Sequence, residues 1–292
     1  MSEFEETVPS AEEGNYTSLY ILAILSVLIA AMGVISNILS LTYFVTRLSA
    51  RDNSTTRLFM MLNIFDLLLC VYSTIMIIIW VQILKMEMPV TFKFFCIIYQ
   101  VVLANLTSFF TCLIAVTRMV DLIWPLSVVE KRQRATNIAI VLYSFCNVCL
   151  AIFQMIYISS KDMSNTSHVI VLWTIASMMT SLFVIVIFSN VLCILKLYKS
   201  NLQTITTTRH ATITVGILSV IYCVCNVGFI ADRVKYAFNT HLDETLLSVV
   251  FHSILLPLNS ACNPVVYFAR KAEMRLYLKN IWRKARGVQE SE

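Results

Sequence analysis

Long apolar stretches constrain this sequence more than any other feature. Seven are present, near residues 18–46, 56–84, 91–117, 136–158, 169–195, 211–231 and 245–268. Each is long enough to cross the roughly 30 Å hydrocarbon core of a bilayer as an α-helix. Only 13% of the residues are charged, whereas a soluble domain has about a quarter. The sequence therefore predicts an all-α membrane protein that forms a bundle of seven transmembrane helices.

Three regions are expected along the chain. Residues 1–17 form an acidic N-terminal tail, residues 18–268 form the seven-helix domain, and residues 269–292 form an amphipathic eighth helix with a cytoplasmic tail. In the last region, apolar side chains such as Leu276 and Trp282 lie among basic ones. This pattern is typical of helices that lie on a membrane surface, so membrane lipid is a predicted partner. The alternative for this region is a solvated basic tail.

The basic residues are distributed unevenly between the two sides of the predicted bundle. Of the 22 Lys and Arg residues, 17 lie in segments that share one side, namely 47–57, 118–134, 196–210 and 270–292. Cytoplasmic loops carry such an excess of basic residues. We therefore expect a multi-pass protein of the plasma membrane, with the N-terminus outside the cell and the C-terminus in the cytoplasm. The net charge of +5 is a sum over two opposed faces and does not indicate a nucleic-acid partner.

Glycosylation motifs and cysteines agree with this topology. Asn15 in NYT and Asn165 in NTS are glycosylation acceptors that fall on the outer side. Eight of the nine cysteines lie well inside predicted spans, where cysteine behaves as a small apolar residue. The ninth, Cys96, lies near the outer end of its span, and the outer loops offer it no partner. A disulfide framework is therefore not expected. The sequence also has no nucleophile–base pair, metal cluster or phosphate-binding loop, so we do not expect an enzyme.

One carboxylate, that of Asp66, lies in the middle of a predicted span. Such a charge costs about 2.5–3.5 kcal/mol to insert and usually faces the interior of a bundle. Neutral polar side chains in other spans are expected near it, namely Asn37, Thr107, Asn259, Ser260 and Asn263. A carboxylate among hydroxyls and amides suits a small cation such as sodium, or a proton. The alternative is that these polar groups only hold the helices together.

A proline follows this polar group in the last span. Pro264 removes one backbone donor and is expected to free a carbonyl near Ser260, which makes the break a candidate hinge. Tyr267 lies one turn further toward the cytoplasm, near the level expected for Arg118. A hinge that moves a tyrosine toward a buried arginine has the geometry of a switch.

With these motifs, nearly the whole chain resembles the rhodopsin-like (class A) family of G-protein-coupled receptors. The resemblance is carried by Gly33 and Asn37, by Leu62 and Asp66 in LNIFD, by Arg118 seven residues before Pro125, and by Asn259, Ser260 and NPVVY at 263–267. It implies that Asp66, Thr107, Asn259, Ser260 and Asn263 form an allosteric sodium pocket. It also implies that Arg118 contacts a heterotrimeric G protein and that Tyr267 moves toward Arg118 on activation.

Several features of that family are replaced in this sequence. Thr117 stands where an acidic residue precedes the arginine, so Arg118 lacks its neighbouring carboxylate, which favours basal activity. Residues 223–226 read CVCN and lack the tryptophan and proline of the family's sixth helix. Lys93 stands in place of the bridging cysteine. These departures indicate a divergent member.

The ligand is expected to be extracellular, either a peptide or a small molecule. Pro257 stands where opsins have their retinal-binding lysine, and Gln100 where aminergic receptors have an aspartate. Candidate pocket residues are Gln100, Ala104, His252 and Ser253, although such residues more often pack or face solvent. Two other functions stay open: a non-signalling seven-helix partner protein, and a proton- or ion-coupled transporter that uses Asp66.

Overall fold

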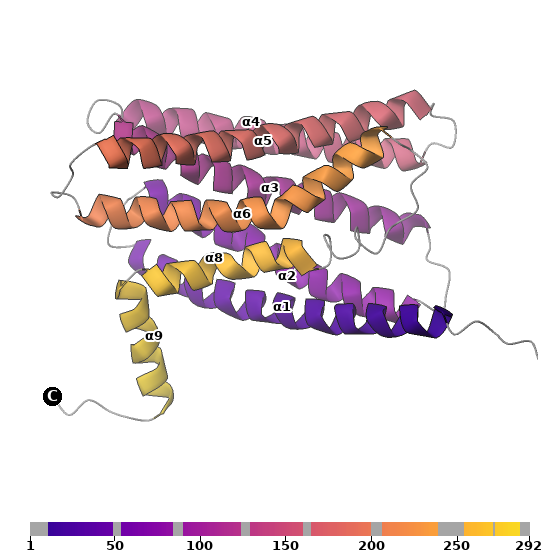
Figure 1. Ribbon diagram of the computed structural model, residues 1–292, viewed down its shortest axis with the longest axis horizontal. Coiled ribbons are helices and arrows are strands. Elements are labelled where there is room, and N and C mark those ends of the chain that lie inside the picture. The colour runs from indigo at the N-terminus through magenta and orange to yellow at the C-terminus, as the bar shows by residue number, and fades with distance from the viewer. Residues whose placement is uncertain are drawn as a thin grey trace, which may run out of the picture.

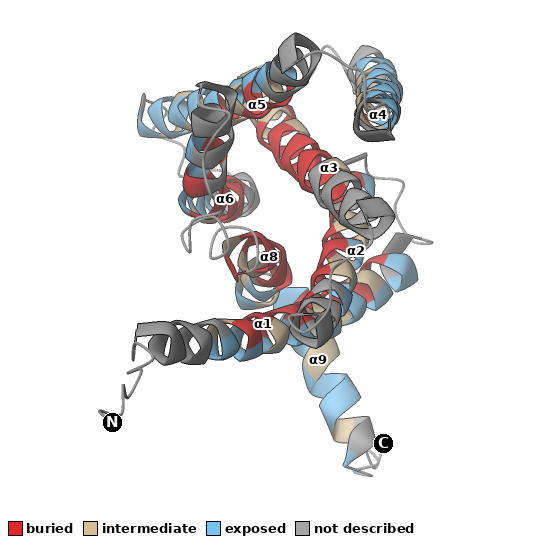
Figure 2. Cartoon of the chain, turned by 90° about the vertical axis from the view of Figure 1, so that its right-hand side faces the viewer, coloured by how far each residue is buried: buried red, intermediate tan, exposed pale blue. Residues whose placement is uncertain are grey.

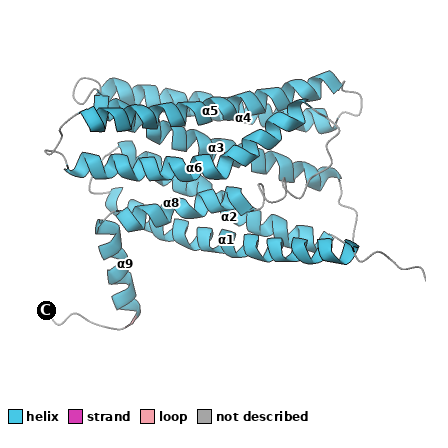
Figure 3. Ribbon diagram, viewed as in Figure 1, coloured by secondary structure: helices cyan, strands magenta, loops and turns pink. Residues whose placement is uncertain are grey.

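The computed structural model describes residues 11–48, 54–83, 90–123, 129–159, 165–199, 206–238, 254–270 and 272–286, and helix is the regular structure throughout them (Figures 1 and 3). The helices are α1 (Ala11–Leu48), α2 (Ser54–Ile83), α3 (Val90–Ile123), α4 (Val129–Ser159), α5 (Asn165–Lys199), α6 (Thr206–Phe238), α8 (Leu256–Arg270) and α9 (Ala272–Ala285). The predicted all-α fold is confirmed. The first helix extends beyond the predicted span, since residues 11–17 of the expected tail are helical too.

Five of these helices are long and apolar enough to cross a membrane. The segments are Tyr20–Thr46, Thr56–Ile75, Val102–Ile123, Gln133–Phe153 and Trp173–Tyr198, one in each of α1 to α5. The apolar part of α6, Thr212–Gly228, is shorter. Of the last predicted stretch, residues 245–253 lie outside the described part of the chain. The protein is therefore a helical, multi-pass membrane bundle, and its sixth and seventh spans stay a prediction.

The helices run side by side, and α9 turns away from the others at the end of the bundle (Figure 1). Helix α8 packs against α1, α2 and α6, while α3 packs against α2, α4, α5 and α6. Viewed along the bundle, the buried faces turn inward and the exposed faces turn outward (Figure 2). The outward faces are apolar, as Ile138 and Phe145 of α4 illustrate with 59% and 66% exposure. Apolar residues on the outside are expected where lipid surrounds a protein.

One glycine sets the distance between α1 and its neighbours. A Cβ atom added at Gly33 would lie 2.5 Å from Cys70 Sγ in α2 and 3.2 Å from Ala261 Cβ in α8. Real Cβ atoms essentially never come as close as 2.5 Å to another heavy atom, and a distance of 3.2 Å is shorter than most real Cβ contacts. A packed interior has little room to relieve such contacts. Gly33 therefore allows α1 to reach both helices, and it lies one turn from Asn37, whose contacts are described below.

Replacing Gly33 with Ala should lower the free energy of unfolding by about 1–3 kcal/mol, the usual range for overpacking a core. The matched control is Gly216→Ala in α6, where an added Cβ meets nothing within 4 Å. That change should be neutral or stabilise by up to about 1 kcal/mol, because alanine favours helix over glycine. Reversible unfolding of the purified protein in detergent measures both. Adding Cys70→Ala to the Gly33 variant should recover part of the loss, and equal effects of the two glycine changes would contradict this account.

The predicted amphipathic segment after the last span is a helix, α9. Met274 is fully buried, and the Tyr43 hydroxyl of α1 donates a hydrogen bond to Glu273 Oε2 at 3.1 Å. The rings of Tyr43 and Tyr277 meet edge to face, with centroids 5.4 Å apart. These contacts fix one face of α9 to the end of α1. Trp282, 61% exposed, lies on a part of α9 that stays open to the surroundings.

Candidate functional site

The Asp66 carboxylate is fully buried and faces α8. Ser260 Oγ donates to Asp66 Oδ1 at 2.8 Å, and Asn263 Nδ2 donates to Asp66 Oδ2 at 2.7 Å. These short distances are typical of hydrogen bonds to an ionised acceptor. Ser260 and Asn263 are three residues apart in a helix and therefore share one face. Within the described part of the chain, Asp66 pairs with no Lys or Arg side chain.

Two further oxygen atoms of the predicted pocket are buried and have no hydrogen-bond partner among the described residues. Thr107 Oγ1 of α3 is near enough to the Asp66 carboxylate to interact with it, but not in the geometry of a hydrogen bond. Asn259 Oδ1 of α8, in the residue next to Ser260, is the second. A buried polar atom without a partner costs about 1–3 kcal/mol. These oxygens therefore fit a site that receives an additional ligand or water.

A side chain of α1 bonds the carbonyl that Pro264 leaves without a donor in α8. Because Pro264 has no N–H, the Ser260 carbonyl loses its donor within the helix. Asn37 Nδ2 lies 3.2 Å from that carbonyl and donates to it, and it also donates to the Gly33 carbonyl at 2.9 Å. The carbonyl that the sequence predicts to be free is thus paired with the polar residue predicted on α1. Asn37, Asp66, Ser260 and Asn263 form one network across α1, α2 and α8.

Tyr267 and Arg118 do not meet in this structure. The Tyr267 ring is fully buried and packs edge-on against Phe59 and Phe44, with centroids 4.9 and 6.0 Å away. Its hydroxyl makes no hydrogen bond with the residues that the structure describes. Arg118 lies at the cytoplasmic end predicted for α3 and is partly exposed. The predicted movement of Tyr267 toward Arg118 would therefore belong to another state of the protein.

A carboxylate one turn beyond Arg118 was not anticipated by the sequence reasoning. Asp121 Oδ2 lies 3.8 Å from Arg118 Nη1, within the same helix. The Thr117 hydroxyl, in the position of the family's acidic residue, donates to the Leu113 carbonyl of its own helix. The expectation that Arg118 lacks an adjacent acid holds at position 117 but is incomplete. The signal that finds Asp121 is its spacing of three residues, which places it beside Arg118 on a helix.

A hydrogen bond between side chains, which was also not predicted, joins α5 to α6. Asn190 Nδ2 donates to Ser219 Oγ at 2.8 Å, and Ser219 donates to the Val215 carbonyl at 2.9 Å. Asn226, in the CVCN stretch, is fully buried and donates to the Tyr222 carbonyl. Helix α6 changes direction along its length although it contains no proline (Figure 1). Helix α6 is therefore bent (Figure 1) although residues 223–226 lack the tryptophan and proline that the resemblance would lead one to expect.

For most of the predicted ligand-pocket and glycosylation residues, the structure does not describe the side chain. Ala104 is buried in a small core cluster with Leu69, Leu103 and Leu256, so it packs rather than lining an opening. Gln100 lies within α3, Asn15 within α1 and Asn165 at the start of α5, and the structure does not describe their side chains. His252 and Ser253 fall in the undescribed segment 239–253. The outer pocket therefore stays a prediction.

The sequence matches no protein-family model and no curated protein. The assignment of a function therefore depends on the motifs and on the geometry described above.

Proposed function

We propose that the protein is a rhodopsin-like G-protein-coupled receptor of the plasma membrane, with seven spans and its N-terminus outside the cell. An extracellular peptide or small molecule would shift its bundle between two states, and the active state would catalyse nucleotide exchange on a heterotrimeric G protein. The observation that carries the proposal is the Asp66 network. The buried Asp66 carboxylate accepts hydrogen bonds from Ser260 and Asn263 of α8. Beside it, Asn37 of α1 donates to the Ser260 carbonyl, which Pro264 leaves without a donor in its own helix.

The network supports a switch because it connects the proline-containing helix α8 to α2 through one side chain, that of Asp66. The described hydrogen bonds to Asp66 come from Ser260 and Asn263, both in α8. A change in the charge or occupancy of this site would alter both of these contacts between α2 and α8 together. Such a localised change in charge, acting on an element with two stable positions, is how ligand switches generally work.

The residues present also fit the sodium ion that the resemblance implies. Carboxylate, hydroxyl and amide oxygens are the ligands of hard cations. Asp66, Thr107, Asn259, Ser260 and Asn263 would hold the ion, and the buried oxygens of Thr107 and Asn259 have no hydrogen-bond partner among the described residues. The ion would supply the positive charge that the described part of the chain does not place beside Asp66.

The proposal is tested by nucleotide exchange with the purified full-length protein in lipid nanodiscs. A panel of G-protein subtypes would be combined with peptide and metabolite libraries, in NaCl and in KCl at equal ionic strength. Sodium should lower basal exchange of the wild type several-fold, because a ligand shifts a two-state equilibrium toward the state that it binds more tightly. The variant Asp66→Asn should show the same exchange in both salts, because it keeps the shape of the side chain and removes its charge.

Two results would contradict the proposal. One is the absence of exchange above that of the G protein alone, across the whole panel. The other is uptake of a solute that depends on Asp66, which would favour a transporter. Among the described residues Asp66 is the only buried carboxylate, so a proton relay through this part of the bundle would have to rely on it alone.

A further inference from the structure

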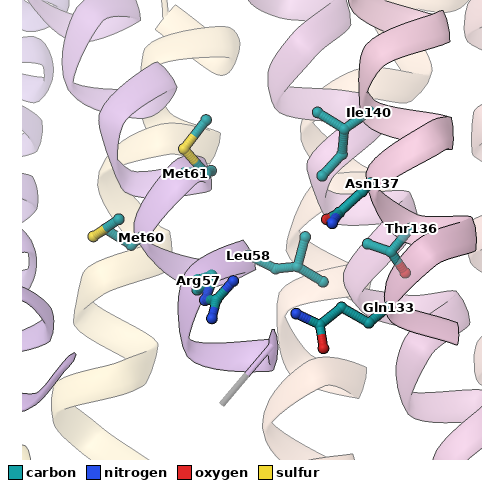
Figure 4. Close-up of a pocket in the computed structure, with 8 residues that line it drawn as sticks. All are labelled: Arg57, Leu58, Met60, Met61, Gln133, Thr136, Asn137 and Ile140. Atoms are coloured by element: carbon teal, nitrogen blue, oxygen red, sulfur yellow. The ribbon is translucent and has the colours of Figure 1, made fainter. Parts of the chain in front are cut away.

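A groove lies between the first turns of α2 and α4, on the outside of the bundle. Its volume is about 230 Å³, and its walls include Arg57, Leu58 and Met61 of α2 and Gln133, Thr136 and Ile140 of α4 (Figure 4). Enclosed pockets for drug-sized ligands are usually about 300–1,000 Å³. This groove is therefore too small to enclose such a ligand, and it suits part of a molecule that continues along the protein surface.

The polarity of the groove changes along its length. Arg57 and Gln133 lie at one end, and Met61 and Ile140 lie at the other (Figure 4). Gln133 and Ile140 are seven residues apart, which corresponds to about 10 Å along a helix. Thr136 lies between them. A charged end, a neutral polar middle and an apolar end follow the same order as the phosphate, the ester groups and the acyl chain of a glycerophospholipid.

The charge at the polar end favours an anionic lipid over a neutral one. Arg57 is exposed and lines the groove where α2 begins. The first turns of α4 at the same end contain Lys131, Arg132 and Arg134 in sequence, and one acidic residue, Glu130. Each Lys or Arg near an anionic membrane surface contributes about 1 kcal/mol of attraction. In a zwitterionic lipid such as phosphatidylcholine the choline cation offsets the charge of the phosphate, and a sterol has no anionic group, so both gain less from these basic residues than an anionic lipid does.

We propose that this groove binds one anionic glycerophospholipid, such as phosphatidylserine, with its phosphate at Arg57 and one acyl chain against Leu58, Met61 and Ile140. The lipid would connect α4 to α2. Helix α4 has few contacts within the bundle beyond those to α3, and its other faces are largely exposed (Figure 2). A bound lipid would therefore supply packing that the described residues leave out. This proposal does not depend on the proposed function.

Native mass spectrometry of the purified full-length protein in detergent tests the proposal. Phosphatidylserine and phosphatidylcholine with identical acyl chains would be titrated separately. The wild type should bind one phosphatidylserine about fivefold more tightly than phosphatidylcholine, the effect of one arginine at the headgroup. Arg57→Gln should remove this preference. Lys196→Gln should keep it, because Lys196 is an exposed cation at the same end of the bundle but on α5.

A second variant tests the groove itself. Thr136→Trp fills the middle of the groove and should reduce binding of the first lipid of either type several-fold, and Asn137→Trp serves if the first variant does not fold. Equal binding of the two lipids by the wild type would overturn the proposal. Equal loss of preference in the Arg57 and Lys196 variants would overturn it too, as would unchanged lipid binding in a folded groove-filled variant or tighter binding of a sterol than of phosphatidylserine.

Discussion

Replacing Ser260 with Ala and Asn263 with Leu in one chain should lower the free energy of unfolding by about 3–5 kcal/mol. Both substitutions remove donors from the Asp66 carboxylate, whose two oxygens accept them at 2.8 and 2.7 Å. A buried charge that loses its partners keeps its cost of desolvation, which is larger than the net value of the bonds. Unfolding of the purified protein in detergent, followed by circular dichroism or by steric trapping, measures the loss.

A neutral pair elsewhere in the bundle is the matched control. Asn190 donates to Ser219 at 2.8 Å, the same distance as Ser260 to Asp66, and Ser219 is also buried. The double change Ser219→Ala with Asn190→Leu should cost only about 1 kcal/mol, the usual value of a neutral hydrogen bond.

A third substitution distinguishes the effect of the unpaired Asp66 charge from the effect of lost packing. Adding Asp66→Leu to the Ser260 and Asn263 variant should recover most of the lost stability, because an apolar side chain of similar size leaves no unpaired charge. Equal losses for the charged and the neutral pair, or no recovery with Asp66→Leu, would mean that these polar groups only hold helices together. That result would also remove the main support for a cation site.

The sequence could predict the network around Asp66 because each inference behind it concerns a single helix. Ser260 and Asn263 share a face by their spacing, and Pro264 necessarily frees the carbonyl four residues earlier. An ionised side chain in a span must face other polar groups, which limits the partners of Asp66 to a few positions. The structure places Asn37, Ser260 and Asn263 in these roles.

Contacts that depend on the rotation of one helix against another were not predicted. The ring of Tyr267 lies against Phe44 and Phe59, and Asn190 meets Ser219 across α5 and α6. Spacing within a helix shows which residues share a face, but it does not show which neighbour that face meets. The first helix also extends beyond its predicted span, to Ala11, because hydropathy marks the limits of the hydrocarbon region and not the ends of a helix.

Arg118→Ala should reduce receptor-catalysed nucleotide exchange by about thirtyfold or more while leaving the amount of folded protein unchanged. Removing one hydrogen-bonded charge from a protein interface typically costs about 2–5 kcal/mol. Arg118 lies at the end of α3 in a partly exposed position, where a partner can reach it. Exchange would be measured with the purified protein and the G protein that responds best. Lys196→Ala, which removes an exposed cation at the same end of the bundle, should retain most of the activity.

The partner of Arg118 provides an opposite test. Asp121 Oδ2 lies 3.8 Å from Arg118 Nη1, and both side chains are about a quarter exposed. Such pairs contribute about 0–1 kcal/mol, so Asp121→Asn should raise basal exchange at most about fivefold, by releasing Arg118 more often. A loss of exchange in both variants would mean that Asp121, and not the freed arginine, contacts the G protein. Full exchange in Arg118→Ala would show that this arginine has no part in coupling, and the switch would then have to act through another residue of α3.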